Sequence, residues 1–108
     1  MLNLHEKAVS SSLGTTYYWT NDIDSDISLV FLPGLSADHR LFEFQLDAFK
    51  DEYKVVAWDC PCHGKSRPYD KFSYLNVCNE LDSILEKESV DKAVFIGQSL
   101  GGMIAQYY

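Results

Sequence analysis

Short apolar runs alternate with amphipathic stretches along most of the chain. Three runs are almost continuously apolar, which is typical of strands covered on both faces, as in a parallel sheet; they lie at Ser28–Leu32, Lys54–Trp58 and Lys92–Ile96. An earlier aromatic and β-branched run, Thr15–Thr20, also predicts a strand, and we expect the residues around Ala8 and Val9 to pair with it.

Helical spacing of apolar residues lies between and after these runs. A first helix is predicted to place one apolar side inward, made of Leu41, Phe42, Leu46 and Phe49. A second helix is expected to have Ser73 as its N-cap and to bury the stripe Tyr74, Val77, Cys78, Leu81, Ile84 and Leu85. Its opposite, polar face is expected to carry Asn79, Glu80, Asp82, Glu86 and Lys87. A third helix is predicted from Leu100, Met103, Ile104 and Tyr107.

This alternation of strands and helices decides the fold class. Short connections between them predict right-handed β-α-β crossovers and a mainly parallel sheet with flanking helices. The 108 residues fit one domain or part of one, and the apolar fraction of 46% is ordinary for a chain that buries a core. We therefore expect an α/β fold.

The charge balance and the amino-terminal sequence narrow the classes of partner and location. Sixteen acidic residues against nine basic ones give a net charge of -7, without a cluster of Lys and Arg, which argues against nucleic acid and anionic membranes as partners. Residues Met1–Gly14 show no leader pattern, and no apolar stretch approaches the ~20 residues that span a bilayer. The three cysteines are expected to be reduced. We expect a cytoplasmic protein.

The last apolar run leads into a motif that carries chemistry. Gly97-Gln98-Ser99-Leu100-Gly101 joins the run to the third predicted helix, as expected of a nucleophile elbow. A serine on such a strained turn has its hydroxyl lifted out of the sheet, and the flanking glycines let the turn pack tightly. Serine is a poor nucleophile alone and needs a histidine base and an orienting carboxylate.

Together with two upstream loops, this motif resembles the α/β-hydrolase fold family of esterases, lipases, thioesterases and C–C-bond hydrolases. Leu32-Pro33-Gly34-Leu35 is similar to the oxyanion-hole loop after the third strand. Asp59–Ser66 is similar to the Asp-x-Pro-Gly-His-Gly-x-Ser loop after the fourth strand, and Gly97–Gly102 to the elbow after the fifth. The order of the three motifs predicts about five strands and three helices.

The resemblance implies a role for each matched residue. Ser99 would be the nucleophile, and the backbone N–H groups of Leu35 and Leu100 would form the oxyanion hole. The elbow would be shaped by Gly97, Gln98, Gly101 and Gly102, and the oxyanion loop by Pro33 and Gly34. The substrate would be a small ester, thioester or similar acyl compound that passes through an acyl-enzyme, without a cofactor or metal. Two positions depart from the family pattern: Pro33 stands where many relatives have histidine, and Cys62 where they have glycine.

The same resemblance places half of the machinery beyond Tyr108. The triad acid and histidine, the lid and the later strands follow the elbow helix in the family, so residues 1–108 are expected to be the N-terminal part of one domain and nearly inactive alone. The alternative is a truncated product that acts, if at all, as a binding or structural fragment. In the family's order the fifth strand lies beside the third, so we expect an open apolar edge at Ala93–Ile96 and self-association there.

Other reactive residues have less specific interpretations. His5, His39 and His63 are candidate bases for Ser99, although none matches the family's base position; His39 is expected at the surface or against substrate, and His63 as a turn residue. Zinc ligand types occur at Cys60, Cys62, His63 and Cys78, but the Cys-x-Cys spacing is tighter than that of common zinc sites. Gly64-Lys65-Ser66 resembles the end of a phosphate-binding loop without its opening glycine, which rejects phosphate binding.

Overall fold

The computed structural model describes residues 4–108. In this part of the chain five strands, three α-helices and one short 3₁₀-helix follow one another. In chain order they are β1 (His5–Ser11), β2 (Gly14–Thr20), β3 (Ile27–Leu32), η1 (His39–Phe42), α1 (Glu43–Phe49), β4 (Lys54–Trp58), α2 (Tyr74–Lys87), β5 (Lys92–Gly97) and α3 (Leu100–Tyr107). No helix among the described residues has the length and apolar character needed to cross a membrane.

The strands form one mixed sheet in the order β1-β2-β4-β3-β5. The predicted parallel arrangement is confirmed for β4, β3 and β5. The hairpin β1–β2 adds antiparallel strands at the other side, with Ala8 opposite Tyr17 and Val9 opposite Thr16, as expected from the sequence. The fifth strand lies beside the third, at an end of the strand order.

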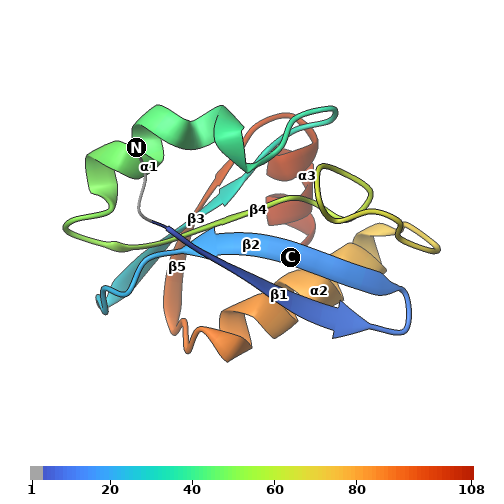
Figure 1. Cartoon of the computed structure of the whole chain (residues 1–108), viewed down its shortest axis with the longest axis horizontal. Helices are drawn as coiled ribbons and strands as arrows, with labels where there is room; N and C mark the ends of the chain where they lie inside the picture. Colours follow the sequence, from blue (N-terminus) through green and yellow to red (C-terminus); the bar gives the residue numbers. More distant parts are fainter. Residues whose placement is uncertain (1–3) are drawn as a thin grey trace.

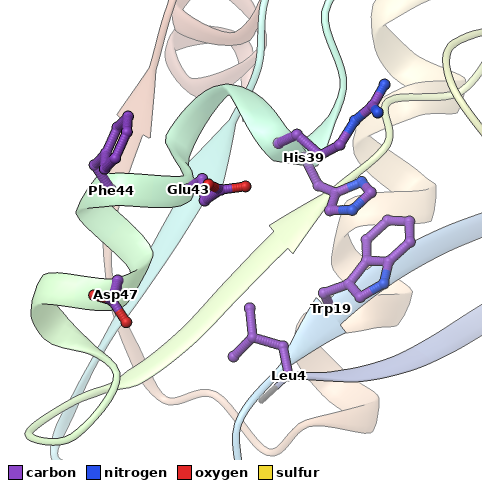
Figure 2. Close-up of a pocket in the computed structure, with 7 residues that line it drawn as sticks. Leu4, Trp19, His39, Glu43, Phe44 and Asp47 are labelled. Atoms are coloured by element: carbon purple, nitrogen blue, oxygen red, sulfur yellow. The ribbon is translucent and has the colours of Figure 1, made fainter. Parts of the chain in front are cut away.

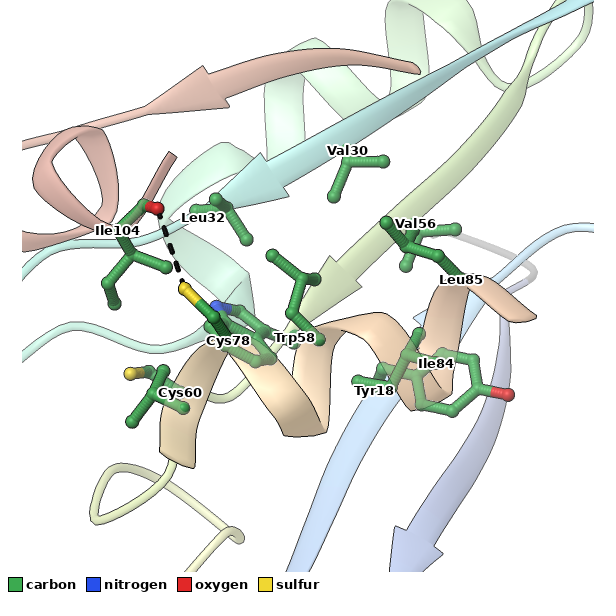
Figure 3. Close-up of a cluster of buried hydrophobic side chains, with 12 residues drawn as sticks. Tyr18, Val30, Leu32, Val56, Trp58, Cys60, Cys78, Ile84, Leu85 and Ile104 are labelled. Carbon is green, nitrogen blue, oxygen red and sulfur yellow. Dashed lines mark hydrogen bonds between the residues drawn. The ribbon is translucent and has the colours of Figure 1, made fainter. Parts of the chain in front are cut away.

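The period-two alternation of the central strands supplies both layers of the core. Helix α1 covers one face of the sheet and α2 the other (Figure 1). On the α2 face, strand residues such as Leu32, Val56 and Trp58 pack with side chains of α2 and with Ile104 of α3 (Figure 3). The alternate residues Phe31, Val55 and Ala57 pack with η1 and α1 on the other face. Because successive side chains of a strand point to opposite faces, both helix layers are anchored by β3 and β4.

Helix α2 confirms its predicted cap and stripe, with one exception. The Ser73 hydroxyl accepts the N–H of Asn76 at 3.0 Å, and Val77, Leu81 and Ile84 are fully buried. Glu80 was predicted on the polar face, which is wrong: it is 4% exposed. The Tyr69 hydroxyl donates to Glu80 at 2.9 Å and the Ser11 hydroxyl at 2.6 Å. The carboxylate is therefore satisfied by hydroxyls from the loop before α2 and from β1.

The apolar sides predicted for the other two helices are confirmed only in part. Around α1, Phe42 and Leu46 are buried, whereas Leu41 and Phe49 are 44% and 42% exposed. Residues His39–Phe42 form a 3₁₀-helix, whose tighter turn moves Leu41 out of the expected line.

In α3, too, only part of the predicted apolar side is buried. Ile104 is fully buried against α2 and the sheet. Met103 and Tyr107 are more than half exposed, because α2 and the sheet cover only one side of this helix.

A buried ion network ties the hairpin to the end of α2. Glu88, just after α2, lies 3.0 Å from the ammonium of Lys54 and 3.1 Å from that of Lys7, and the Tyr18 hydroxyl donates to it. Burial alone would raise the pKa of Glu88, but these donors hold it below its ordinary value. The network joins β1, β2 and β4 to the chain segment that leads into β5.

Candidate active site

The loops after β3 and β5 meet at the carboxyl edge of the parallel strands, where α/β proteins bind their ligands. A Cβ added to Gly34 would lie 3.1 Å from the Cβ of Ser99 and 2.7 Å from the carbonyl oxygen of Gln98. The N–H of Gln98 donates to the Leu32 carbonyl at 3.1 Å. The two segments that the sequence singled out, Leu32–Leu35 and Gly97–Gly101, therefore touch, and Gly34 has no room for a side chain.

Ser99 lies on a strained turn between β5 and α3. Its backbone has φ 55° and ψ -115°, outside the regions that L-residues ordinarily occupy. Such a conformation costs about 1–3 kcal/mol and persists only where the surroundings impose it. The side chain is exposed, makes no capping bond to α3, and has no hydrogen-bond partner among the described residues. The hydroxyl is thus free at the start of a helix.

The glycines of the elbow differ in how much room each has for a side chain. A Cβ on Gly97 would lie 2.5 Å from the N of Gly102, and one on Gly101 would overlap the carbonyl of Leu32. Both glycines are therefore required by the close approach of β5, α3 and β3. A Cβ on Gly102 would meet only the Gly97 carbonyl, at 3.5 Å, which is ordinary contact. Gly102 was grouped with the shaping residues, but crowding does not require glycine there.

Two backbone N–H groups in the segments that meet at Ser99 have no acceptor among the described residues. Leu100 is the first residue of α3, where an N–H has no acceptor within the helix. Leu35 follows Gly34 in the loop that touches Ser99, and no acceptor among residues 4–108 takes its N–H. Its side chain is 71% exposed.

The loop after β4 is fixed by a buried carboxylate. Asp59 is 1% exposed and accepts three hydrogen bonds of 2.8 Å, from the N–H of His39, the Nδ1 of His39 and the N–H of Lys65. Burial would raise the pKa of Asp59, but these bonds hold it below its ordinary value. Cys62 has φ 77°, so this turn accepts a side chain at the position where the resemblance led us to expect glycine.

None of the three histidines is bonded to Ser99. His5 pairs with Asp22 at 2.7 Å, and the ring of His63 contacts its neighbouring Pro61 carbonyl at 3.1 Å, as expected of a turn residue. His39, predicted at the surface or against substrate, has a side chain that is 24% exposed; its ring is held by Asp59 and stacks on Trp19 with ring centroids 3.4 Å apart. The pairing of His39 with Asp59, twenty residues away, was not predicted, although an Asp directly after a buried strand is a recognisable signal.

A cavity of 560 Å³ lies beside His39, away from the elbow. Residues of β2, η1 and α1 line it together with Leu4, and Figure 2 shows Trp19 and His39 at one end and Glu43 and Asp47 along α1. No elbow residue contributes to its lining. The cavity is therefore separate from the serine.

The cysteines do not gather into a metal site. Sγ of Cys62 contacts the Tyr69 carbonyl at 3.7 Å and Sγ of Cys78 the Ile104 carbonyl at 3.8 Å (Figure 3). Burial raises the pKa of the Cys60 thiol to about 12, which keeps it protonated. Among the described residues one close group of ligand types occurs, Asp38, His39 and Asp59. Within this group His39 bonds to Asp59, and Asp38 accepts hydrogen bonds from Arg40.

The chain is similar to known hydrolases along nearly its whole length. It is 29% identical over 106 residues to 3-oxoadipate enol-lactonase 1 of Acinetobacter baylyi, covering 97% of this chain and 40% of the relative. It is also 29% identical to the solved structure of Est816, described as an N-acyl homoserine lactone degrading enzyme, with a TM-score of 0.83 over 92% of this chain and 38% of the other. A mutant epoxide hydrolase of Vigna radiata shares the fold, with a TM-score of 0.87 at 16% identity over 99% of this chain and 34% of the other.

These matches agree with the strand order and with the strand, turn and helix around Ser99. The chain spans about two fifths of the length of these relatives or less. A family model described as the alpha/beta hydrolase fold matches residues 27–108, which include both loops and the elbow. The chain therefore belongs to the α/β-hydrolase fold family, as the N-terminal part of that fold, and its relatives include hydrolases of esters and lactones.

Proposed function

We propose that this chain carries the nucleophile and the oxyanion hole of a serine hydrolase that acts on esters, lactones or thioesters. The observation that carries the proposal is the strained backbone of Ser99, at φ 55° and ψ -115°, on a turn that presses against Gly34. Strain of this kind is kept where it serves a site. The hydroxyl has no hydrogen-bond partner among the described residues, and the proposal assigns the N–H groups of Leu35 and Leu100 as the donors that acyl transfer requires.

In the proposed reaction, Oγ of Ser99 attacks the carbonyl carbon of the substrate while a base takes the hydroxyl proton. The carbonyl oxygen becomes negative and accepts hydrogen bonds from the N–H groups of Leu35 and Leu100. Collapse of the tetrahedral intermediate expels the alcohol or thiol, which receives the proton, and leaves an acyl-serine. Water then attacks that ester and releases the acid.

The base is proposed to come from residues outside this chain. His5, His39 and His63 are each bonded elsewhere, and a serine without a base is a weak nucleophile. Alone, the 108-residue chain should therefore acylate slowly. The substrate class is supported by the named relatives, of which one is an enol-lactonase and another degrades an acyl homoserine lactone.

Labelling by a fluorophosphonate tests the proposal on the chain as it is. The Ser99 oxygen forms the bond to phosphorus, fluoride leaves, and added imidazole takes the proton in place of the proposed base. We expect slow labelling of Ser99 that imidazole accelerates, and complete loss in Ser99→Ala. Ser83→Ala, an exposed serine of α2, is the matched control and should label like the unchanged chain. Peptide mass spectrometry identifies the labelled residue.

A second function is favoured by the engagement of all three histidines away from Ser99. In this proposal the chain performs no acyl transfer and acts as a binding or structural unit of the same fold. A folded chain that imidazole cannot activate would support this second function and contradict the first.

A further inference from the structure

The loop between β3 and η1 carries Leu35 in a tight turn. The N–H of Ala37 donates to the Gly34 carbonyl at 3.1 Å, which closes a turn with Leu35 and Ser36 as its central residues. Ser36 has φ 64°, and a positive φ at the second central residue is typical of a type II turn. The N–H of the first central residue takes no part in closing such a turn, so that of Leu35 is left as a donor. Its direction depends on how the whole turn is held.

The turn has an anchor on each side. On one side Gly34 packs against Ser99. On the other, His39 at the start of η1 is bonded to Asp59 twice, through its N–H and through Nδ1, each at 2.8 Å. The ring of His39 also stacks on Trp19 of β2 (Figure 2). Asp59 is 1% exposed and its second oxygen is bonded within the β4 loop, so this carboxylate cannot turn away from His39 without losing bonds.

The central residues of the turn have no hydrogen bonds of their own to a neighbouring element. Leu35 and Ser36 are exposed, and their polar groups have no partner among residues 4–108. A donor of an oxyanion hole must lie about 2.7–3.1 Å from the oxygen that becomes negative, and a displacement of about 1 Å can cost a hundredfold in rate. The bonds between His39 and Asp59 therefore limit how far the Leu35 N–H can move.

We propose, on the basis of the proposed function of Ser99 and Leu35, that His39 and Asp59 are positioning residues for the oxyanion hole. Their hydrogen bonds hold the turn so that the Leu35 N–H points at the oxygen that becomes negative, and neither side chain contacts the substrate. Loss of the bond from the His39 ring lets the turn move and weakens the stabilisation of the oxyanion. The attack by Ser99 then slows, whereas binding of the reagent before the attack does not change.

Saturation kinetics of fluorophosphonate labelling, with imidazole present, test this role on chains that circular dichroism shows to be folded. His39→Leu removes the ring donor and should lower the maximal labelling rate about tenfold, with little change in the half-saturating concentration. His39→Asn places an amide N–H where Nδ1 lies and should restore most of the rate, although it too loses the stacking on Trp19. His5→Leu breaks another His–Asp pair, that with Asp22, and should label like the unchanged chain.

A double variant separates positioning from a general loss of order. Leu35→Pro removes the donor itself, so His39→Leu should slow labelling no further in that background. A further tenfold slowing there, an unchanged rate in His39→Leu alone, or a rate that His39→Asn does not restore would overturn the positioning role and leave Ser99 as the nucleophile. Absence of any labelling at Ser99 would instead overturn the proposed function, and the positioning role with it.

Amide hydrogen exchange tests the same coupling in the unchanged chain, without a variant. If the bonds of His39 aid donation by Leu35, an adduct that accepts the Leu35 N–H must in turn strengthen those bonds, because coupling between two sites is reciprocal. Phosphonylation of Ser99 should therefore slow exchange of the His39 amide several-fold. The Asn76 amide, bonded to Ser73 at the start of α2, should keep its rate. Exchange of the His39 amide that phosphonylation does not change would contradict the proposal.

Discussion

Two turns at the same edge of the sheet show opposite uses of polar groups. After β4, Asp59 accepts three hydrogen bonds, and Ser66 donates to the Asp59 carbonyl at 2.6 Å while accepting the N–H of Tyr17 at 2.9 Å. After β5, the Ser99 side chain has no such partner, and its turn is held by close glycine contacts and by backbone hydrogen bonds such as that from Gln98 to Leu32. The first turn engages its polar groups internally, whereas the second leaves its hydroxyl free.

This contrast in hydrogen bonding distinguishes a side chain that is free to react from side chains that hold the fold together. The β4 loop holds a carboxylate, two thiols and an imidazole, a richer set than the elbow. Each of these groups is buried or contacts a neighbouring group, whereas the Ser99 hydroxyl is neither buried nor hydrogen-bonded among the described residues. Backbone strain alone does not distinguish the two turns, since Cys62 and Ser99 both have positive φ. The two turns differ in whether the side chain is free of hydrogen bonds.

Close packing at the elbow should give the largest effect. Gly101→Ala places a Cβ onto the Leu32 carbonyl, and we expect a loss of about 3 kcal/mol or more in the free energy of unfolding. Gly102→Ala, one residue later, meets only ordinary contact and should stabilise by about 0.5–1 kcal/mol, because alanine is the better helix former. Urea unfolding measures both. Equal effects at the two positions would mean that crowding does not hold this turn.

The donor role of the β3 loop is tested next. Leu35→Pro removes the backbone N–H, and Leu35→Ala shortens the side chain but keeps it. If Leu35 is an oxyanion donor, the proline variant should label with fluorophosphonate about a hundredfold more slowly, equivalent to roughly 3 kcal/mol, and the alanine variant at the original rate. Similar rates in both variants would remove Leu35 from the proposed site.

The buried carboxylate of the β4 loop should make stability depend on pH. Since the folded pKa of Asp59 lies below its unfolded value, its contribution is complete above the unfolded value of about 3.9 and is lost as pH falls through the folded one. Asp59→Asn should cost about 2 kcal/mol at pH 7 and flatten the acid limb of the stability curve. Asp24→Asn, at an exposed position, is the control. An unchanged acid limb would contradict this account.

Relief of backbone strain is the smallest expected effect and separates the two turns. Cys62→Gly and Ser99→Gly should each stabilise the fold by about 1 kcal/mol, because glycine adopts positive φ freely. Only Ser99→Gly should abolish labelling, whereas Cys62→Gly should leave it unchanged. Thermal unfolding and the fluorophosphonate assay give the two readouts. A Ser99→Gly variant without added stability would show that the turn is not strained.

Local patterns predicted the strands, the cap at Ser73 and the elbow, because each depends on residues close together in the sequence. The buried Glu80 was not predictable, since its cover comes from Tyr69 in a loop that must first be placed. The pairing of His39 with Asp59 likewise depends on two loops that meet only in the folded sheet. The exposed side of α3 depends on what packs over the helix, which its own periodicity does not contain.

The sequence pattern identified only some of the features of the elbow glycines. The pentapeptide pattern correctly marked Gly97 and Gly101, which three neighbouring backbone segments crowd. It gave no reason to separate Gly102 from them, because that difference lies in distances to other residues rather than in sequence order. The loop after β3 shows the same kind of requirement, since Gly34 has no room for a side chain beside Gln98 and Ser99.

The burial of Cys60 allows local opening of the fold to be measured by alkylation of a natural cysteine. With its pKa at about 12 and its side chain 2% exposed, Cys60 resists alkylation while the fold is closed. Cys62, two residues away, is partly exposed, and we expect it to react without any opening. The ratio of the two alkylation rates therefore reports how often the sheet and α2 separate, in a single native sample and without denaturant.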